Sequence, residues 1–138
     1  MRKEVLKEPI FAKEIAEIIK VSPSIEEMRE QLRDYHENDI AQSFEFLNRA
    51  ERNLLYSALD AKWMAEIIAY IDNPSEYIEE IGIDKLAEII NEMDADDAVD
   101  LWEDIDESVK VKLRPMIDDE TKTDIRLITL MTKMRLEV

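Results

Sequence analysis

Apolar residues recur along the chain at the spacing of one buried face of an α-helix. Three successive segments carry apolar side chains at positions i, i+3, i+4 and i+7, the pattern of an amphipathic helix. The three sets are Met64, Ile67, Ile68 and Ile71; Leu86, Ile89, Ile90 and Met93; and Ala98, Leu101, Trp102 and Ile105. No alternating strand pattern of useful length is present, so the sequence predicts an all-α chain.

These helical segments belong to an internal repeat marked by aspartate. The aspartates are Asp60, Asp72, Asp94, Asp106 and Asp118, at spacings of 12, 22, 12 and 12 residues. Twelve is not a helical period, so a turn must reset the helix between units. We expect each aspartate to N-cap the next helix by accepting a hydrogen bond from a backbone amide. The repeat predicts an α-solenoid, a superhelix of about nine or ten short helices with a step of about 12 residues.

The flanking segments follow the same logic. Three apolar faces precede Asp60: Phe11, Ile15, Ile18 and Ile19; Ile25, Met28, Leu32 and Tyr35; and Ile40, Phe44 and Leu47. Val21-Ser22-Pro23 separates the first two, and Ser24 with Glu27 predicts a capping box. Later, Asn73-Pro74 predicts a helix start with proline at the first helical position, and Gly82 predicts its end. The unit at 49–60 keeps Leu55, Tyr56 and Leu59, and the unit at 107–118 is degenerate, with Val109, Leu113 and Met116 offset.

Composition excludes several classes of function. The chain of 138 residues has no cysteine, one histidine and one glycine, so thiol chemistry, a histidine-rich metal site and a glycine-rich phosphate loop are all excluded. The formal net charge of −16 makes nucleic acid an unexpected partner, because phosphate binding needs basic residues. No catalytic arrangement is present, and we expect no enzyme. There is no apolar run of membrane-spanning length, and Met1-Arg2-Lys3-Glu4 leads into no apolar segment, so neither membrane insertion nor a secretory signal is expected.

The negative charge is concentrated in one stretch. Between Asp60 and Glu107 there are 17 acidic and 2 basic residues. Its densest part is the start of one predicted helix, where six carboxylates crowd together: Asp94, Asp96, Asp97, Asp100, Glu103 and Asp104. Those at helical spacings repel one another. A divalent cation would relieve that repulsion, and Mg²⁺ prefers carboxylate oxygens while keeping several waters. An EF-hand is excluded, because Val99 and Ile105 stand where that loop needs glycine and glutamate.

Each of these features also has a structural interpretation, which stays open. Asp94 is expected to be an N-cap and the other carboxylates a solvated face. His36 is either a ligand or pH sensor, or a residue that starts the helix near Asp39. Trp102 is expected to pack in the core, whereas Trp63 precedes its stripe and is expected to be more exposed, as at an interface.

Two phrases carry a resemblance to a known family. His36-Glu37-Asn38-Asp39-Ile40-Ala41 is similar to a His-Pro-Ala-Asp-Ile-Ala phrase. The segment from Glu92 to Leu101 resembles a Glu-Met-Asp-Pro-Asp-Asp-Ala-Ala-Asp-Leu phrase. Both phrases are typical of the N-terminal domain of MgtE family magnesium transporters, and the similarity runs from about Ser24 to Met131. Glu37 and Ala95 replace prolines of the family, which affects the rigidity of turns more than chemistry.

The resemblance implies a right-handed superhelical domain that senses intracellular Mg²⁺. In the family this domain moves against paired CBS domains, and acidic residues at that interface are bridged by ions. The resemblance thus implies a regulatory domain with weak, interfacial Mg²⁺, and Asp94, Asp96, Asp97, Asp100 and Asp104 as metal ligands. The implied partners are the CBS and membrane domains of a parent transporter that is a homodimer at full length. The implied location is cytoplasmic, at the cytoplasmic face of the plasma membrane within such a transporter.

The domain boundaries follow from the same comparison. Residues 1–23 are expected to be an N-terminal leader helix, 24–131 the helical domain, and 132–138 the junction to CBS domains, because Leu130-Met131-Thr132 resembles that junction. Neither the CBS nor the membrane domain is matched, so transport by this chain itself is not expected. The repeat also resembles the helical domains of the flagellar rotor switch protein FliG. The alternative function is therefore a protein–protein scaffold without ion sensing.

Overall fold

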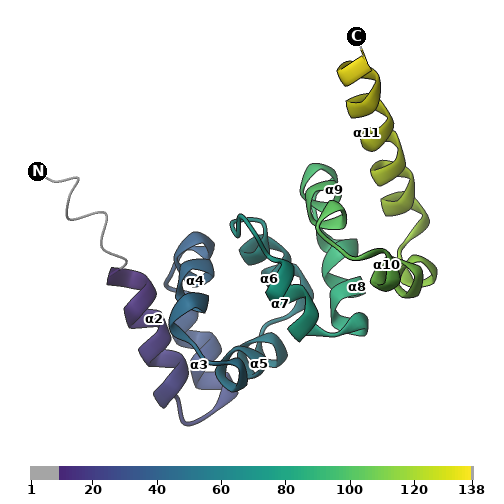
Figure 1. Cartoon of the computed structure of the whole chain (residues 1–138). Helices are drawn as coiled ribbons and strands as arrows, with labels where there is room; N and C mark the ends of the chain where they lie inside the picture. The colour runs from purple at the N-terminus through teal and green to yellow at the C-terminus, as the bar shows by residue number, and fades with distance from the viewer. Residues whose placement is uncertain (1–9, 138) are drawn as a thin grey trace, which may run out of the picture. The chain divides into compact units, whose positions relative to one another are not determined.

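The computed structural model describes residues 10–137, and across that range the chain forms α-helices and short 3₁₀ turns, with no strand (Figure 1). The helices fall into two compact units that divide between Ile71 and Asp72. The prediction of an all-α chain is therefore confirmed.

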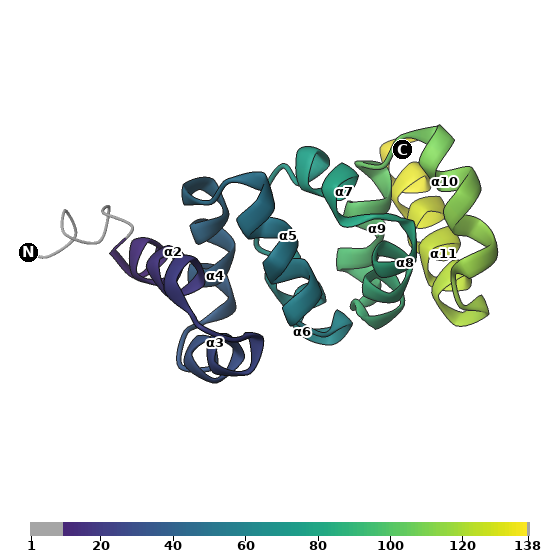
Figure 2. The ribbon, with the colours of Figure 1, turned by 90° about the horizontal axis from the view of Figure 1, so that it is seen from below.

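The first unit is built around the helix that was predicted as a leader. It contains α2 (Ile10–Val21), α3 (Ile25–Leu32), α4 (Glu37–Ser43), η1 (Phe44–Phe46), α5 (Arg49–Ala58) and α6 (Ala61–Ile68). Helix α2 packs against α3, α4, α5 and η1, and α4 packs against α6 (Figure 2). The fully buried large side chains of this unit come from every helix: Ile15, Met28, Leu32, Ile40, Phe44, Leu55, Leu59, Met64 and Ile67.

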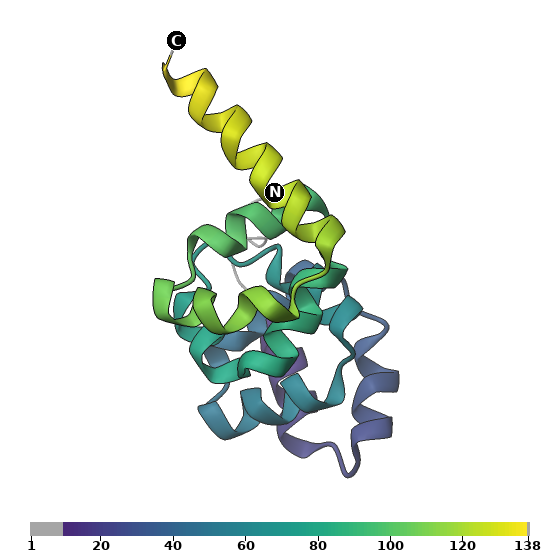
Figure 3. The same ribbon diagram turned by 90° about the vertical axis from the view of Figure 1, so that its right-hand side faces the viewer.

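The second unit has a smaller core and one long helix. It contains α7 (Ser75–Ile81), α8 (Ile83–Glu92), α9 (Ala95–Glu103), α10 (Glu107–Leu113), η2 (Arg114–Met116) and α11 (Asp119–Glu137). Helix α8 contacts α7, α9 and α10, and α11 packs along α9. The C-terminal part of α11 extends past the other helices of the unit (Figure 3). With 19 residues, α11 is an exception to the prediction of short helices.

Most of the predicted apolar faces are buried. Met64, Ile67, Ile68, Leu86, Ile89, Ile90, Ala98, Leu101 and Ile105 all lie in the cores. Three predicted members are exposed instead: Phe11, Ile25 and Met116. Phe11 and Ile25 stand in the first turns of α2 and α3, and Met116 ends η2, where neighbouring helices no longer cover the stripe. Phe11 still contacts Tyr35 edge-on, with ring centroids 6.1 Å apart.

The repeat is more regular in the structure than its aspartates indicate. Helices α3 to α6 of the first unit start after residues 24, 36, 48 and 60. Helices α8 to α11 of the second unit start after 82, 94, 106 and 118. Each step within these two series is therefore 12 residues, which holds one short helix and its turn. The single step of 22 residues holds α7 and the point where the two units divide.

The start of α7 differs from the prediction. The N-cap is Pro74 rather than Asn73, and Ser75 is the first helical residue. Proline can hold this position because an N-cap contributes its carbonyl to the helix, and the Ile78 amide donates to Pro74 O at 2.9 Å. Gly82 ends α7 as predicted. Its φ of 94° lies in the left-handed region, which glycine adopts without a Cβ clash.

The predicted domain boundaries remain predictions. Residues 1–9 of the expected leader lie outside the described residues, and the part from Ile10 to Val21 is α2. Helix α11 continues without a break through the expected junction at residue 132. Among the described residues, none of the helices has both the length and the apolar character needed to cross a lipid bilayer.

Candidate functional site

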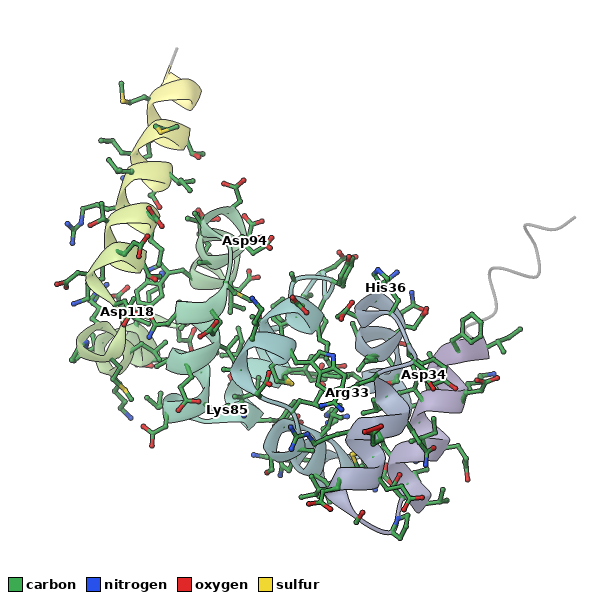
Figure 4. The ribbon with its side chains drawn as sticks, turned by 180° about the vertical axis from the view of Figure 1, so that it is seen from behind. Arg33, Asp34, His36, Lys85, Asp94 and Asp118 are labelled. Carbon is green, nitrogen blue, oxygen red and sulfur yellow. The ribbon has the colours of Figure 1, made fainter. Side chains whose placement is uncertain are left out.

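The five predicted metal ligands lie on or beside α9. The buried face of this helix is Ala98, Val99 and Leu101, which packs into the second unit. The carboxylates occupy the remaining positions, so burial of the apolar stripe turns them outward. Asp94, Asp96, Asp100 and Asp104 are exposed, whereas Asp97 is half-buried. Figure 4 labels Asp94 at the start of α9.

Asp94 does not cap α9 with its side chain. It occupies the N-cap position with extended backbone angles, and its carbonyl accepts from the Ala98 amide at 2.9 Å, but its carboxylate makes no capping hydrogen bond. The same holds for Asp106 before α10. The predicted capping role of these two side chains is therefore wrong. The bond that defines an N-cap needs only the backbone carbonyl, and a side chain turned towards water leaves it intact.

The equivalent residue of the first unit behaves as predicted. The Trp63 amide donates to Asp60 Oδ1 at 2.8 Å. The comparison shows that the repeat position alone does not decide whether the side chain of an aspartate caps the helix that follows it. In α9 the carboxylate of Asp94 remains available to interact with its neighbours.

Asp97 shows the electrostatic strain of this arrangement. Burial raises the pKa of the Asp97 carboxyl above its ordinary value, and the negative charges of Asp94, Asp100 and Asp96 raise it further. Burial opposes ionisation because a charge loses hydration, and like charges add to that cost. The charges of three predicted ligands thus act on a fourth, Asp97, and a nearby cation would relieve this repulsion.

The fifth predicted ligand lies apart from that centre. Asp104 is the C-cap of α9, at the opposite end of the helix, and it is not among the charges that raise the pKa of Asp97. Across the residues that the structure describes, no three His, Cys, Asp or Glu side chains converge closely enough to hold a metal ion directly. The donors suit a hard cation chemically. Their arrangement suits a hydrated cation, held through water, better than a closed protein cage.

His36 acts as a helix cap. It precedes α4, and the Asn38 amide donates to its Nδ1 at 2.9 Å. Its ring also contacts Tyr70 edge-on, with centroids 5.4 Å apart. The structural interpretation of His36 is confirmed, although α4 begins at Glu37 rather than near Asp39.

The two tryptophans are both half-buried. Trp63 lies beneath the Arg33 guanidinium, 6.0 Å from the ring centroid. Trp102 is wrongly predicted as a core residue, because Lys110 and Arg114 lie over its ring at 5.6 and 5.9 Å. These cations approach from α10 and η2, and keep one face of the indole near the surface. Helical spacing placed Trp102 on the apolar stripe, but it could not show that basic side chains would cover it.

Comparison with known proteins agrees with this fold. The sequence matches the MgtE intracellular N domain over residues 35–129. A solved structure, described as the crystal structure of the soluble part of a magnesium transporter, is similar with a TM-score of 0.73 and 27% sequence identity. The match covers 84% of this chain and 46% of the other, so the chain spans less than half the length of that protein. None of the curated proteins compared with the chain matches it. Because the domain match extends over more than half of its length, the chain belongs to the family of MgtE intracellular N domains.

Proposed function

We propose that this chain is the regulatory cytoplasmic domain of a magnesium transporter, and that the acidic start of α9 senses intracellular Mg²⁺. Membership of the MgtE N domain family supports the regulatory role. The observation that carries the sensing role is the gathering of four carboxylates at the start of α9, those of Asp94, Asp96, Asp97 and Asp100. Burial and the three neighbouring charges raise the pKa of Asp97, which is consistent with that role. Such a cluster gains from a nearby divalent cation, because the cation offsets the mutual repulsion.

The proposed mechanism is a population shift between undocked and docked states. Hydrated Mg²⁺ would be shared between the α9 carboxylates and acidic groups of the CBS domains, so that ions bind the docked state more tightly. Moving a switch from mostly undocked to mostly docked requires about 5.5 kcal/mol of differential binding. Several weak interfacial sites have to share that energy, since a single exposed site is too weak.

The direct test is an amide-shift titration of the isotopically labelled domain with magnesium chloride, against sodium chloride at matched ionic strength. We expect saturable shifts in residues 94–100 that sodium does not reproduce. The double variant Asp96→Asn with Asp100→Asn should lose them. Glu76→Gln with Glu79→Gln is the matched control, because both glutamates are exposed on α7 and lie outside the cluster.

A second measurement addresses docking. In a longer protein that includes CBS domains, the same aspartate variants should weaken the response of domain closure to Mg²⁺, whereas the glutamate control should not. Shifts that sodium reproduces, together with an unchanged closure response in the aspartate double variant, would refute magnesium sensing by α9. That pair of results would favour the alternative, a scaffold whose acidic face binds a basic partner through general electrostatics.

A further inference from the structure

The second unit contains a basic hollow beside Trp102. Its volume is about 160 Å³, and it is lined by Trp102, Arg114, Ile117, Lys122, Ile125 and Arg126. Three of the six lining residues are cationic and none is acidic. This is unexpected in a chain with a net charge of −16. The hollow is therefore a local positive site with an aromatic and aliphatic wall.

Two of its cations have no ion-pair partner among the described side chains. Arg114 pairs with Glu107 at 3.1 Å and also lies over the Trp102 ring. The side chains of Lys122 and Arg126, in contrast, make no ion pair or hydrogen bond with the side chains that the structure describes, those of residues 10–134. Their charge is available to an anionic group from outside.

A row of side chains leads from the hollow along α11. Positions four residues apart form one ridge on a helix surface, and here that ridge consists of Lys122, Arg126, Leu130 and Met134. It is cationic where it lines the hollow and apolar farther on, where Leu130 and Met134 are 53% and 58% exposed. Leu127 and Met131 lie beside it and are 52% and 55% exposed. Ile125 lines the same hollow as Lys122 and Arg126, and it is buried in the unit where α11 packs along α9.

We propose that the Trp102 hollow and this ridge of α11 form a docking surface for an acidic, amphipathic helix of a partner protein. The carboxylates of that helix would reach Lys122 and Arg126, and its apolar side chains would cover Leu130 and Met134. Aromatic, arginine and methionine side chains are the residue types enriched in such interfaces. The positive charge of the hollow would bind the acidic half of the partner helix, and the apolar half of the ridge would bind its apolar half. Together they would fix the direction in which the partner helix lies along α11.

Two other occupants fit less well. A small free anion would satisfy the hollow but leave the apolar half of the ridge uncovered. A second copy of this chain would bring two strongly negative molecules together. The surface shares no side chain with the acidic start of α9.

The test uses the whole chain with Trp63→Phe, so that Trp102 is the remaining tryptophan and its fluorescence reports on the hollow. The probe is a synthetic helical peptide of about 16 residues. It carries glutamates at i, i+4 in one half and leucines at i, i+4 on the same face of the other half. A peptide of equal composition with the two residue types interleaved is the reference. We expect saturable binding of the first peptide at least about tenfold tighter than that of the reference, weakening with added salt.

Matched variants distinguish binding at this surface from nonspecific electrostatic and hydrophobic association. Lys122→Glu with Arg126→Glu, and separately Leu130→Ser with Met134→Ser, should each weaken binding about tenfold or more. Two control variants make the same changes at exposed positions outside the surface: Lys62→Glu with Lys112→Glu, and Val111→Ser with Leu54→Ser. Each should alter the affinity for the peptide less than about twofold. Circular dichroism checks that each variant is folded.

Three results would overturn the proposal. The first is the absence of saturable binding of the ordered peptide to the folded chain. The second is an equal loss in the control variants. The third is binding of benzoate as tight as that of the peptide, with the two serine substitutions on α11 having no effect, which would indicate a small-anion site instead.

Discussion

The two units start their helices in different ways, although they share a twelve-residue step. In the first unit, every side chain before a helix from α3 to α6 accepts a hydrogen bond from the helix that follows: Ser24, His36, Asn48 and Asp60. In the second unit, the residues before α7 to α10 make no such bond: Pro74, Gly82, Asp94 and Asp106. The same position in the repeat therefore either stabilises its own helix or leaves a carboxylate available for other interactions.

One carboxyl in each unit shows the electrostatic side of this difference. A hydrogen bond from the Asn48 amide, followed by the bond and charge of Lys20, lowers the pKa of Glu51. Burial and three neighbouring aspartates raise the pKa of Asp97. Glu51 thus stabilises the first unit, whereas the second unit keeps repelling carboxylates at the start of α9. That repulsion opposes folding, which agrees with the binding role that we propose for this end of the helix.

The largest expected effect tests whether the two cores are equally well packed. Ile67 and Ile89 hold corresponding positions in α6 and α8, and both are fully buried. Replacing either with alanine should lower the free energy of unfolding by about 2–4 kcal/mol, because each removal leaves a cavity. Denaturant unfolding gives the loss, and hydrogen exchange shows which unit becomes less protected. A loss below about 1 kcal/mol at Ile89 would mean that the second core is loosely packed.

The next effect concerns the caps. Asp60→Ala removes a side-chain bond to the Trp63 amide and should cost about 1 kcal/mol. Asp94→Ala removes no such bond and also relieves repulsion on Asp97, so its effect should be within a few tenths of a kcal/mol of zero. Thermal unfolding of both variants gives the comparison. Asp60→Asn is the control, because asparagine caps as well as aspartate does.

Equal losses in the two alanine variants would contradict the difference between the units. Asp94 would then act as a cap in solution, and its carboxylate would be less available to a cation than we propose.

The sequence predicted the helices well because their signal is local. Apolar spacing depends on the helical period alone, so stripes such as Leu86, Ile89 and Ile90 are found without any knowledge of the neighbours. The repeat was only half recognised, because aspartate marks it in one part of the chain. Ser24, His36 and Asn48 continue the same step with other residues, which share the ability to accept an amide hydrogen bond rather than a common side chain.

The candidate site was less predictable, because it depends on side-chain orientation and on distant segments. Spacing placed Asp94, Asp96, Asp97 and Asp100 together, but it could not show that Asp97 is half-buried or that Asp94 leaves its helix uncapped. It also grouped Asp104 with them, although one helix length separates the two ends of α9. Helical spacing assigned Trp102 to the core. It could not show that Lys110 and Arg114, which lie outside α9, would cover the ring.

The smallest expected effect is a pair of opposite pH dependences. Because the folded pKa of Glu51 is lowered, its contribution to stability is present above the ordinary glutamate pKa and is lost as the pH falls through the folded value. Glu51→Gln should therefore unfold more easily than the parent at neutral pH and converge with it in acid. Denaturant unfolding at a series of pH values measures both trends.

Asp97 should behave in the reverse sense. Because its folded pKa is raised, its ionisation opposes folding, and this cost appears as the pH rises from the ordinary aspartate pKa through the folded value. Asp97→Asn should thus be more stable than the parent at neutral pH, by a few tenths of a kcal/mol, and the gain should vanish in acid. Magnesium chloride should reduce the gain at neutral pH more than sodium chloride of equal ionic strength, because a bound cation relieves the same repulsion. If Asp97→Asn is no more stable than the parent at any pH, the start of α9 carries no electrostatic strain for a cation to relieve, and the second unit resembles the first.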